Sequence, residues 1–114
     1  MHELGIASSL IEIVIETAKA NDAKKVNIVT AKIGRLAGVD SNALQFAFDA
    51  VKEDYPLIKD STLIIDTVPI TGRCEDCGKT DTYEEMFFAC SSCGSFSVKL
   101  LTGEELTISD IEVD

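Results

Sequence analysis

The sequence predicts an α+β fold in which two helices pack on a three-stranded sheet and a four-cysteine, zinc-ribbon-like lobe is inserted into the chain. Three observations lead to this fold: two segments with apolar residues at helical spacing, three segments with strand-like patterns, and four cysteines confined to residues 74–93. A chain of 114 residues can form one main core with a smaller lobe beside it, but not two ordinary domains.

The first helix is expected over residues 4–20. Apolar side chains recur there at helical spacing, and this stripe comprises Leu4, Ala7, Ile11, Val14, Ile15 and Ala18. Asn21-Asp22 ends the helix, and the β-branched run from Val26 to Ile33 predicts the first strand. Residues 34–40 contain two glycines and are predicted to form a loop.

The second helix begins at Asp40 or Ser41, since either side chain can cap it. Its inner face is predicted to consist of Leu44, Ala47, Phe48 and Val51. It ends at Tyr55-Pro56, because the residue before a proline is pushed out of the helical region.

Two more strands complete the predicted sheet. The second strand covers residues 62–70, and Pro69 indicates an edge position or the exit from the sheet. The third covers residues 104–113. Its alternation slips between Ile108 and Ile111, which indicates a bulge or an early end of the strand.

The domain organisation follows from these elements. Residues 1–71 are expected to form the main domain, which is completed by a C-terminal strand within residues 101–114, while residues 72–100 form the inserted lobe. The lobe has only a short apolar core, predicted as Met86, Phe87, Phe88 and Phe96. These side chains, like Phe46 and Phe48, are interpreted as core rather than as a platform for a ligand.

The four cysteines form two copies of one turn, Cys74-Glu75-Asp76-Cys77-Gly78 and Cys90-Ser91-Ser92-Cys93-Gly94. Thiolates three positions apart can both face one ion, and the following glycine permits a tight turn. Four soft ligands predict tetrahedral zinc, with an iron centre or a dithiol redox pair as alternatives. Because cysteine would fill all four positions, the zinc is expected to be structural rather than catalytic.

The only histidine, His2, follows Met1 directly, and a solvated terminal side chain is its simplest interpretation. The α-amine of Met1 and two nitrogens of His2, from its backbone and its imidazole, can nevertheless close two chelate rings in one plane. Such a set suits Ni(II) or Cu(II). Candidates for the fourth position are Glu3, Asp40, water or a side chain of a partner. The site would be labile near neutral pH, because an imidazole with a pKa of about 6.5 and an amine with a pKa of about 7.7–8.0 must both lose protons.

The composition limits the classes of function. Twenty acidic and ten basic residues give a net charge of -10, which disfavours nucleic acid and suits a cation or a basic protein surface, although solubility explains it equally well. The N-terminus lacks the basic start of a secretory signal, and no window of about 18 apolar residues occurs, so we expect the cytoplasm and no membrane. In the cytoplasm, paired thiols are more often metal ligands or redox centres than disulfides.

Three motifs occur together in this chain: Met1-His2-Glu3-Leu4 opening a helix, Lys32-Ile33-Gly34-Arg35-Leu36 ending a strand, and the two Cys-x-x-Cys-Gly turns. Over essentially its whole length the chain resembles the nickel metallochaperones of hydrogenase maturation, the HypA/HybF family. The resemblance implies that Met1, His2 and Glu3 bind nickel, and that Cys74, Cys77, Cys90 and Cys93 bind structural zinc. Asp40 resembles an acidic position near the nickel end of some members. Some members also have histidines in the zinc lobe, whereas this chain has none.

The resemblance also implies partners and excludes catalysis. Members of the family work with a nickel-handling GTPase to deliver Ni(II) to the hydrogenase large subunit, so we expect ligand exchange, no covalent chemistry and no enzyme. The chain is expected to be a monomer or a homodimer. Two rival classes are a zinc-ribbon interaction or nucleic-acid-binding module, which for nucleic acid would need a basic stripe or stacking aromatics, and a thiol oxidoreductase, which two equivalent cysteine pairs disfavour.

Overall fold

The computed structural model describes residues 3–114, and the chain divides into two compact units. The N-terminal unit comprises Met1–Lys32, Gly38–Asp66 and Thr107–Asp114, and the metal lobe comprises Ile33–Ala37 and Thr67–Leu106. The predicted limits of the main domain, 1–71 with 101–114, and of the inserted lobe, 72–100, stay a prediction. None of the helices in residues 3–114 is long and apolar enough to cross a membrane.

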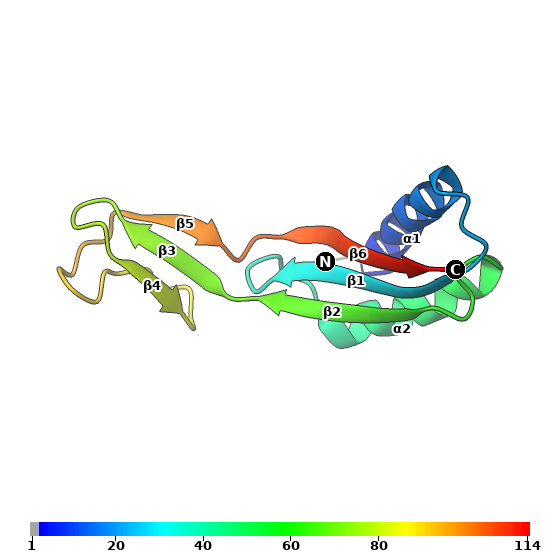
Figure 1. Cartoon of the computed structure of the whole chain (residues 1–114). Coiled ribbons are helices and arrows are strands. Elements are labelled where there is room, and N and C mark those ends of the chain that lie inside the picture. Colours follow the sequence, from blue (N-terminus) through cyan, green and yellow to red (C-terminus); the bar gives the residue numbers. More distant parts are fainter. Residues whose placement is uncertain (1–2) are drawn as a thin grey trace. The chain divides into compact units, whose positions relative to one another are not determined.

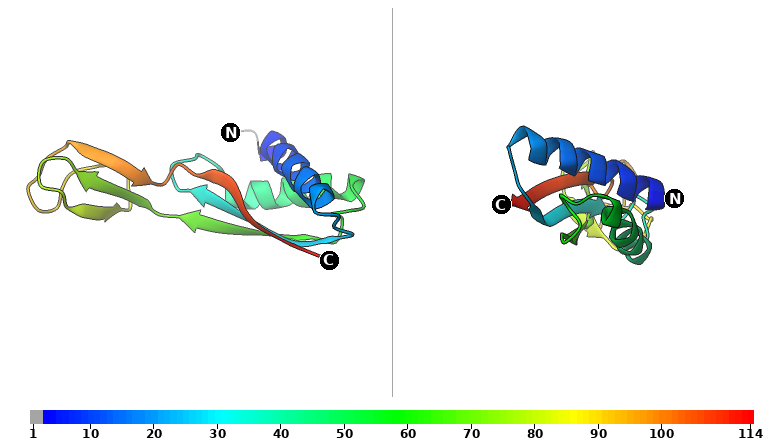
Figure 2. Two further views of the ribbon diagram at one scale, coloured as in Figure 1. Left: turned by 45° about the horizontal axis from the view of Figure 1, so that its top comes forward. Right: turned by 90° about the vertical axis from the view of Figure 1, so that its right-hand side faces the viewer.

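The N-terminal unit has two helices on one face of a sheet with the strand order β2-β1-β6 (Figures 1 and 2). Its elements are α1 (Glu3–Ala20), β1 (Val26–Gly34), α2 (Ser41–Val51), the short 3-10 helix η1 (Lys52–Asp54), β2 (Thr62–Val68) and β6 (Leu106–Val113). In Figure 1, β1 and β2 run in the same direction and β6 in the opposite one, so α2 belongs to the crossover between two parallel strands. The predicted fold class, two helices on a three-stranded sheet with an inserted four-cysteine lobe, is confirmed.

The core of the N-terminal unit lies between the helices and the sheet. It contains Ala7, Leu10, Ile11, Val14 and Ala18 from α1, Leu44, Ala47 and Phe48 from α2, and Val29 and Ala31 from β1. The predicted stripe on α1 was wrong at Leu4, which is 60% exposed on the first turn, and it missed Leu10. Phe46 is also exposed, because it lies two positions from Leu44 and therefore on the opposite side of α2.

The start and end of α2 follow local rules. Of the two predicted caps, Asp40 is the one used: its Oδ1 accepts a hydrogen bond from the amide of Ala43 at 3.0 Å, and the helix begins at Ser41. The helical chain passes into η1 and stops at Asp54, just before Tyr55-Pro56.

The metal lobe contains a second sheet that the sequence did not predict. Its strands are β3 (Ile70–Cys74), β4 (Thr80–Tyr83) and β5 (Val98–Thr102), and β3 pairs antiparallel with both neighbours. Pro69 lies between β2 and β3, where it marks the exit from the first sheet as predicted. β6 continues to Val113 as predicted, which excludes the early strand end, one of the two alternatives offered for the slip in its alternation.

The predicted apolar core of the lobe was largely wrong. Met86, Phe87 and Phe96 are exposed, and only Phe88 is partly buried. The small buried set instead contains Ile70, Tyr83 and two of the cysteines. Because so little apolar surface is buried, this unit depends on other contacts, including those around its cysteines.

Candidate metal centre

The four cysteines of the metal lobe converge on one point. Their sulfur atoms all lie within 4.8 Å of one another, with 3.6 Å between Cys74 and Cys93 and 3.4 Å between Cys77 and Cys90. Four thiolates held tetrahedrally at about 2.3 Å from a zinc ion would be about 3.8 Å apart. The two shortest separations are slightly below this value and all of them are within 4.8 Å, so small shifts of the side chains would suffice to place the four sulfurs around one tetrahedral ion.

Each pair of cysteines lies on a turn with the same backbone hydrogen bond. The amide of Gly78 donates to the carbonyl of Cys74 at 2.9 Å, and the amide of Gly94 donates to that of Cys90 at 3.0 Å. Both glycines have a positive φ, 81° and 76° respectively, which most other residues adopt only with strain. The repeated Cys-x-x-Cys-Gly motif thus reflects a repeated turn.

Backbone amides favour ionisation of one thiol in each turn. In the second turn, the amides of Cys93 and of the residue before it point at the sulfur of Cys90, at 3.5 and 3.4 Å, and lower the pKa of the Cys90 thiol to about 6. In the first turn, the amide of Cys77 lowers the pKa of Cys74 in the same way. For Cys93, the amide of Ser95 lowers the thiol pKa, but the contact with the Cys74 thiol and partial desolvation of this otherwise exposed side chain outweigh that amide and raise the pKa to about 12. A divalent cation suits such a group, since it stabilises several adjacent thiolates at once.

Two carboxylates hold the second turn in place, and the sequence analysis missed both. Asp81, on β4, accepts hydrogen bonds from the amide of Ser91 at 3.1 Å and from its hydroxyl at 2.8 Å. These hydrogen bonds lower the pKa of the Asp81 carboxyl group. Asp76, in the first turn, accepts one from the hydroxyl of Ser95, just after the second turn. Ser and Asp are common in turns of every kind, so their presence between cysteines gave no specific signal.

One buried polar atom beside the cluster is left without a partner. The hydroxyl of Tyr83 forms no hydrogen bond within residues 3–114, and its ring packs edge-on against Phe88 with centroids 5.3 Å apart. Desolvation raises the pKa of this hydroxyl. Tyr83 therefore contributes to the lobe through its ring rather than through its polar group.

Two of the residues predicted for the nickel end, Glu3 and Asp40, lie in the N-terminal unit, and the structure brings them together. Glu3 and Asp40 are 37 positions apart in the sequence, yet the backbone amide of Asp40 donates a hydrogen bond to Glu3 Oε2 at 3.2 Å. The Asp40 carboxylate is itself occupied in capping α2. Met1 and His2 lie outside the described residues. The structure thus places Asp40 beside the segment in which the nickel ligands were predicted.

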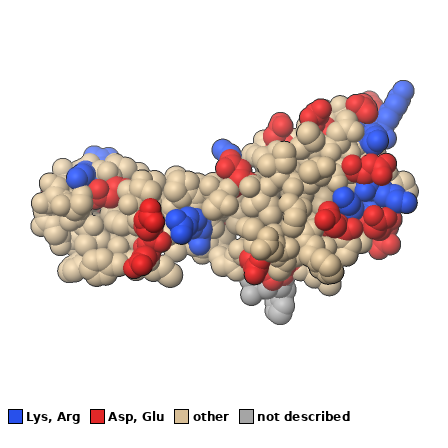
Figure 3. All heavy atoms as spheres, turned by 90° about the horizontal axis from the view of Figure 1, so that it is seen from below, with Lys and Arg blue, Asp and Glu red and all other residues tan. Residues whose placement is uncertain are grey.

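Basic side chains of the N-terminal unit lie next to acidic ones. Three such pairs lie within 4 Å, Lys25–Asp60, Lys52–Asp49 and Lys59–Glu53. Figure 3 shows blue and red spheres side by side at its right-hand end. The basic side chains on this face are thus interspersed with acids rather than arranged in the stripe that a phosphate backbone would favour.

The sequence is similar to those of known proteins over its whole length. Residues 1–113 match the family model described as "Hydrogenase/urease nickel incorporation, metallochaperone, hypA". The chain is 44% identical over 114 residues to the hydrogenase maturation factor HypA of Rhizobium leguminosarum bv. viciae, covering 99% of each chain. It is 36% identical to the HypA of Geobacter metallireducens, with both chains covered completely.

The same similarity is found among solved structures. The solution structure of the Ni metallochaperone HypA from Helicobacter pylori superimposes with a TM-score of 0.72 at 30% sequence identity, and the match covers 99% of this chain and 97% of that one. The similarity therefore extends over both compact units and is not confined to the cysteine turns.

Proposed function

Because this chain belongs to the HypA family of hydrogenase/urease nickel-incorporation metallochaperones, we propose that it binds Ni(II) at its N-terminus and delivers the ion to the large subunit of a [NiFe]-hydrogenase. The observation that carries the proposal furthest is the contact between Glu3 and Asp40, two residues singled out for the nickel end. Hydrogenase rather than urease is chosen because the relatives named above are hydrogenase maturation factors.

The proposed nickel ligands are Met1, His2 and Glu3, with Asp40 as a neighbour of the site. The α-amine of Met1 and two nitrogens of His2 would form a planar set suited to Ni(II) when they close two chelate rings on the ion. Glu3 supports this arrangement, because its carboxylate accepts the Asp40 amide at the start of α1. Nickel is cargo here, so a site that releases its ion readily is an advantage.

For the four-cysteine cluster we propose structural zinc bound by Cys74, Cys77, Cys90 and Cys93. The size of the cluster and the amides directed at Cys90 support this assignment. With four thiolate ligands zinc has no open position for water or substrate, so its role would be to stabilise the lobe. Nickel binding would then belong to residues 1–71 with 101–114, and zinc to residues 72–100.

The proposed route of the ion involves two partners. A nickel-handling GTPase works with this chain, and the hydrogenase large subunit receives the nickel. The ion passes by exchange of its ligands, and no covalent bond of either protein is made or broken. The chain would act as a carrier rather than as an enzyme, in monomeric or homodimeric form. The cytoplasm is the proposed compartment, and the four unpaired thiols fit its reducing conditions.

The experiment is a Ni(II) titration of tag-free, zinc-containing protein by calorimetry, with absorption spectra recorded in parallel. We expect one Ni(II) per chain at micromolar or tighter affinity, with a spectrum of square-planar nickel. His2→Ala should lose this binding, because it removes the imidazole nitrogen from the chelate. A variant with one residue added before Met1 should bind nickel with a different affinity and spectrum, because the free α-amine moves one position and the former amine of Met1 becomes a backbone amide.

Two controls decide the outcome. Zinc content and amide spectra should be unchanged in both variants, so that a loss of nickel is not a loss of fold. If all three proteins bind nickel alike, the N-terminal site is refuted. Transfer is tested by mixing the nickel-bound chain with nickel-free large subunit precursor and following the metal by chromatography; retention by this chain would contradict delivery.

A further inference from the structure

Three large apolar side chains of the metal lobe are exposed: Met86 is 78% exposed, Phe87 68% and Phe96 72%. We call these three residues the apolar patch. The rings of Phe87 and Phe96 touch edge to face, with centroids 5.8 Å apart and an interplanar angle of 79°. Exposed apolar side chains that lie together at a surface, as the rings of Phe87 and Phe96 do, are typical of sites that bind other proteins.

The second cysteine turn holds the patch together. Phe87 precedes Cys90 in the sequence and Phe96 follows Cys93, so the turn closes the loop between the two rings. The turn is tied to β4 by Asp81 and Ser91. Both rings therefore project from a constrained segment, and little conformational freedom would be lost when a partner covers them.

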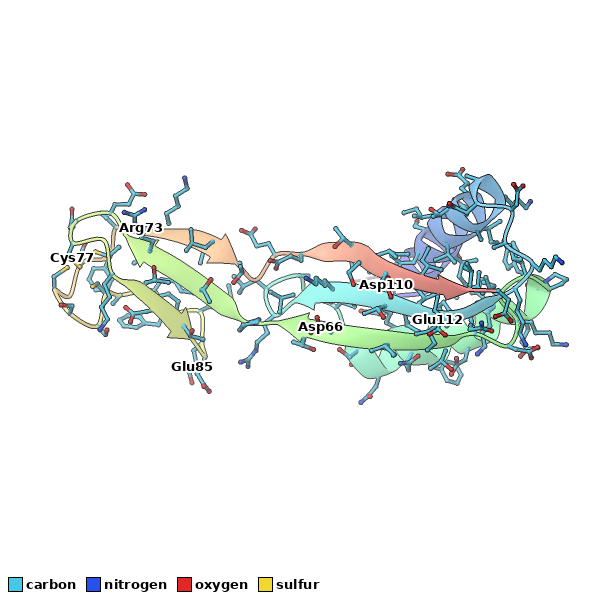
Figure 4. All side chains as sticks on the ribbon, viewed as in Figure 1. Asp66, Arg73, Cys77, Glu85, Asp110 and Glu112 are labelled. Atoms are coloured by element: carbon cyan, nitrogen blue, oxygen red, sulfur yellow. The ribbon has the colours of Figure 1, made fainter. Side chains whose placement is uncertain are left out.

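The surroundings of the patch are acidic. Glu84 and Glu85 directly precede Met86, and both are exposed. In Figure 4, Glu85 projects from the end of β4 away from the ribbon. The ion pairs found within residues 3–114 include neither glutamate, so both carboxylates remain available to a partner.

The charges of Glu84 and Glu85 indicate which kind of protein surface can bind the apolar patch. Two copies of this chain meeting through their patches would bring the glutamates of each copy together, in a protein with a net charge of -10. A basic surface would instead gain favourable contacts with the same carboxylates. The patch itself would supply the aromatic anchors on which protein interfaces rely most.

We propose that the apolar patch, with Glu84 and Glu85 at its rim, binds a partner protein that presents an apolar surface bordered by Lys or Arg. Phe87 and Phe96 act as the anchors, and the glutamates select the basic border. This binding is a property of the lobe and does not depend on nickel at the N-terminus. It gives the lobe a role in recognition in addition to holding its metal.

The test uses the zinc-containing full chain and a defined probe, an amphipathic helical peptide of about 18 residues with leucine on one face and lysine on the other. The control peptide has glutamate in place of lysine. Affinities are measured by calorimetry, and amide spectra locate the binding. We expect the lysine peptide to bind and to shift the signals of residues 84–87 and 96, and the glutamate peptide to bind at least about tenfold more weakly.

Matched variants separate the anchors from the charge. Phe87→Ser with Phe96→Ser keeps the net charge and should weaken binding by at least about tenfold. Phe46→Ser removes an equally exposed ring from the N-terminal unit, 79% exposed, and should change nothing. Glu84→Lys with Glu85→Lys should reverse the preference between the peptides. Because all these side chains are exposed, the zinc content should be native in every variant.

Three results would overturn the proposal. The first is equal binding of the two peptides, which would mean that the rim selects no charge. The second is equal binding by the native chain and the double phenylalanine variant. The third is a dimer of the native chain in sedimentation that the double phenylalanine variant abolishes, because the occupant would then be a second copy. None of these measurements involves nickel, so each outcome is distinct from a failure of the nickel site.

Discussion

The carboxylate of Glu3 and the backbone amide of Asp40 are joined by a hydrogen bond of 3.2 Å, which ties the first residue of α1 to the residue that caps α2. The N-terminal segment is thereby anchored to the loop before α2. Any ligand set built on the first residues of the chain would depend on this contact for its position.

The role of Asp40 can be tested by two substitutions. Asp40→Ala removes the cap of α2 and should lower the free energy of unfolding by about 1 kcal/mol, whereas Asp40→Asn keeps a capping oxygen and should be close to native. Denaturant unfolding followed by circular dichroism measures both. We expect Asp40→Asn to retain native nickel affinity, because the carboxylate is already used in the cap; a loss of nickel in this variant would make Asp40 a ligand instead.

Removal of the zinc proposed for the four-cysteine cluster should unfold the lobe first. A chelator is expected to abolish the amide-exchange protection of β3, β4 and β5 and to leave that of α1 and α2 largely intact, because the lobe buries few apolar side chains. Cys77→Ser should give the same pattern without a chelator. Unchanged protection of residues 72–97 after complete removal of zinc would contradict a structural role for the metal.

Tyr83→Phe should raise the melting temperature of the lobe slightly or leave it unchanged. The hydroxyl is buried without a partner within the described residues, so its removal ends a desolvation cost while the contact of the ring with Phe88 remains. Calorimetry of the zinc-containing protein is the measurement. Tyr83→Leu is the control and should destabilise, since it removes the ring. Clear destabilisation by Tyr83→Phe would reveal a partner for the hydroxyl.

Asp81 should make the stability of the lobe depend on pH. The amide and hydroxyl of Ser91 lower the pKa of Asp81 below its ordinary value of 3.8. A carboxyl group of this kind stabilises the folded state above its unfolded pKa, and the contribution is lost as the pH falls through the folded pKa.

The corresponding measurement compares native protein with Asp81→Asn at each pH, because acid also releases metal from thiolates. The native chain should have the higher melting temperature between pH 7 and pH 5, by a constant margin, because the lowered pKa of Asp81 keeps the carboxylate ionised over this whole range. Ser91→Ala removes the hydroxyl that donates to Asp81, so the difference in melting temperature between proteins with and without Asp81→Asn should be smaller in a Ser91→Ala background. A margin that falls between pH 7 and pH 5 would contradict the lowered pKa of Asp81, and the absence of any margin would exclude the ionised carboxylate as a stabilising group.

Much of the N-terminal unit could be predicted from the sequence. The periodicity of α1, the β-branched run of β1 and the cap of α2 are local signals, and the structure follows them. The error at Leu4 arises because helical spacing defines a stripe but not how much of it the neighbouring elements cover. The error at Phe46 has a different cause: an aromatic side chain suggested a core position, although Phe46 lies on the side of α2 opposite Leu44.

The metal lobe was harder to predict. Strand β4, Thr80–Tyr83, carries mostly polar side chains, and its pairing with β3 through the backbone leaves no hydrophobic pattern to detect. The aromatic residues suggested a core, but a lobe this small cannot bury them all. The spacing of the cysteines was informative, because two identical turns predict one shared centre, and their sulfurs do lie together.

The order of the strands along the chain has a consequence for synthesis. The sheet of the N-terminal unit is complete only with β6, which follows the metal lobe in the sequence and lies beside β1. On the ribosome, therefore, all four cysteines emerge before the last strand of that sheet. Domains generally fold as units while the nascent chain grows. The lobe can accordingly acquire its metal and fold while the earlier part of the polypeptide still awaits its edge strand.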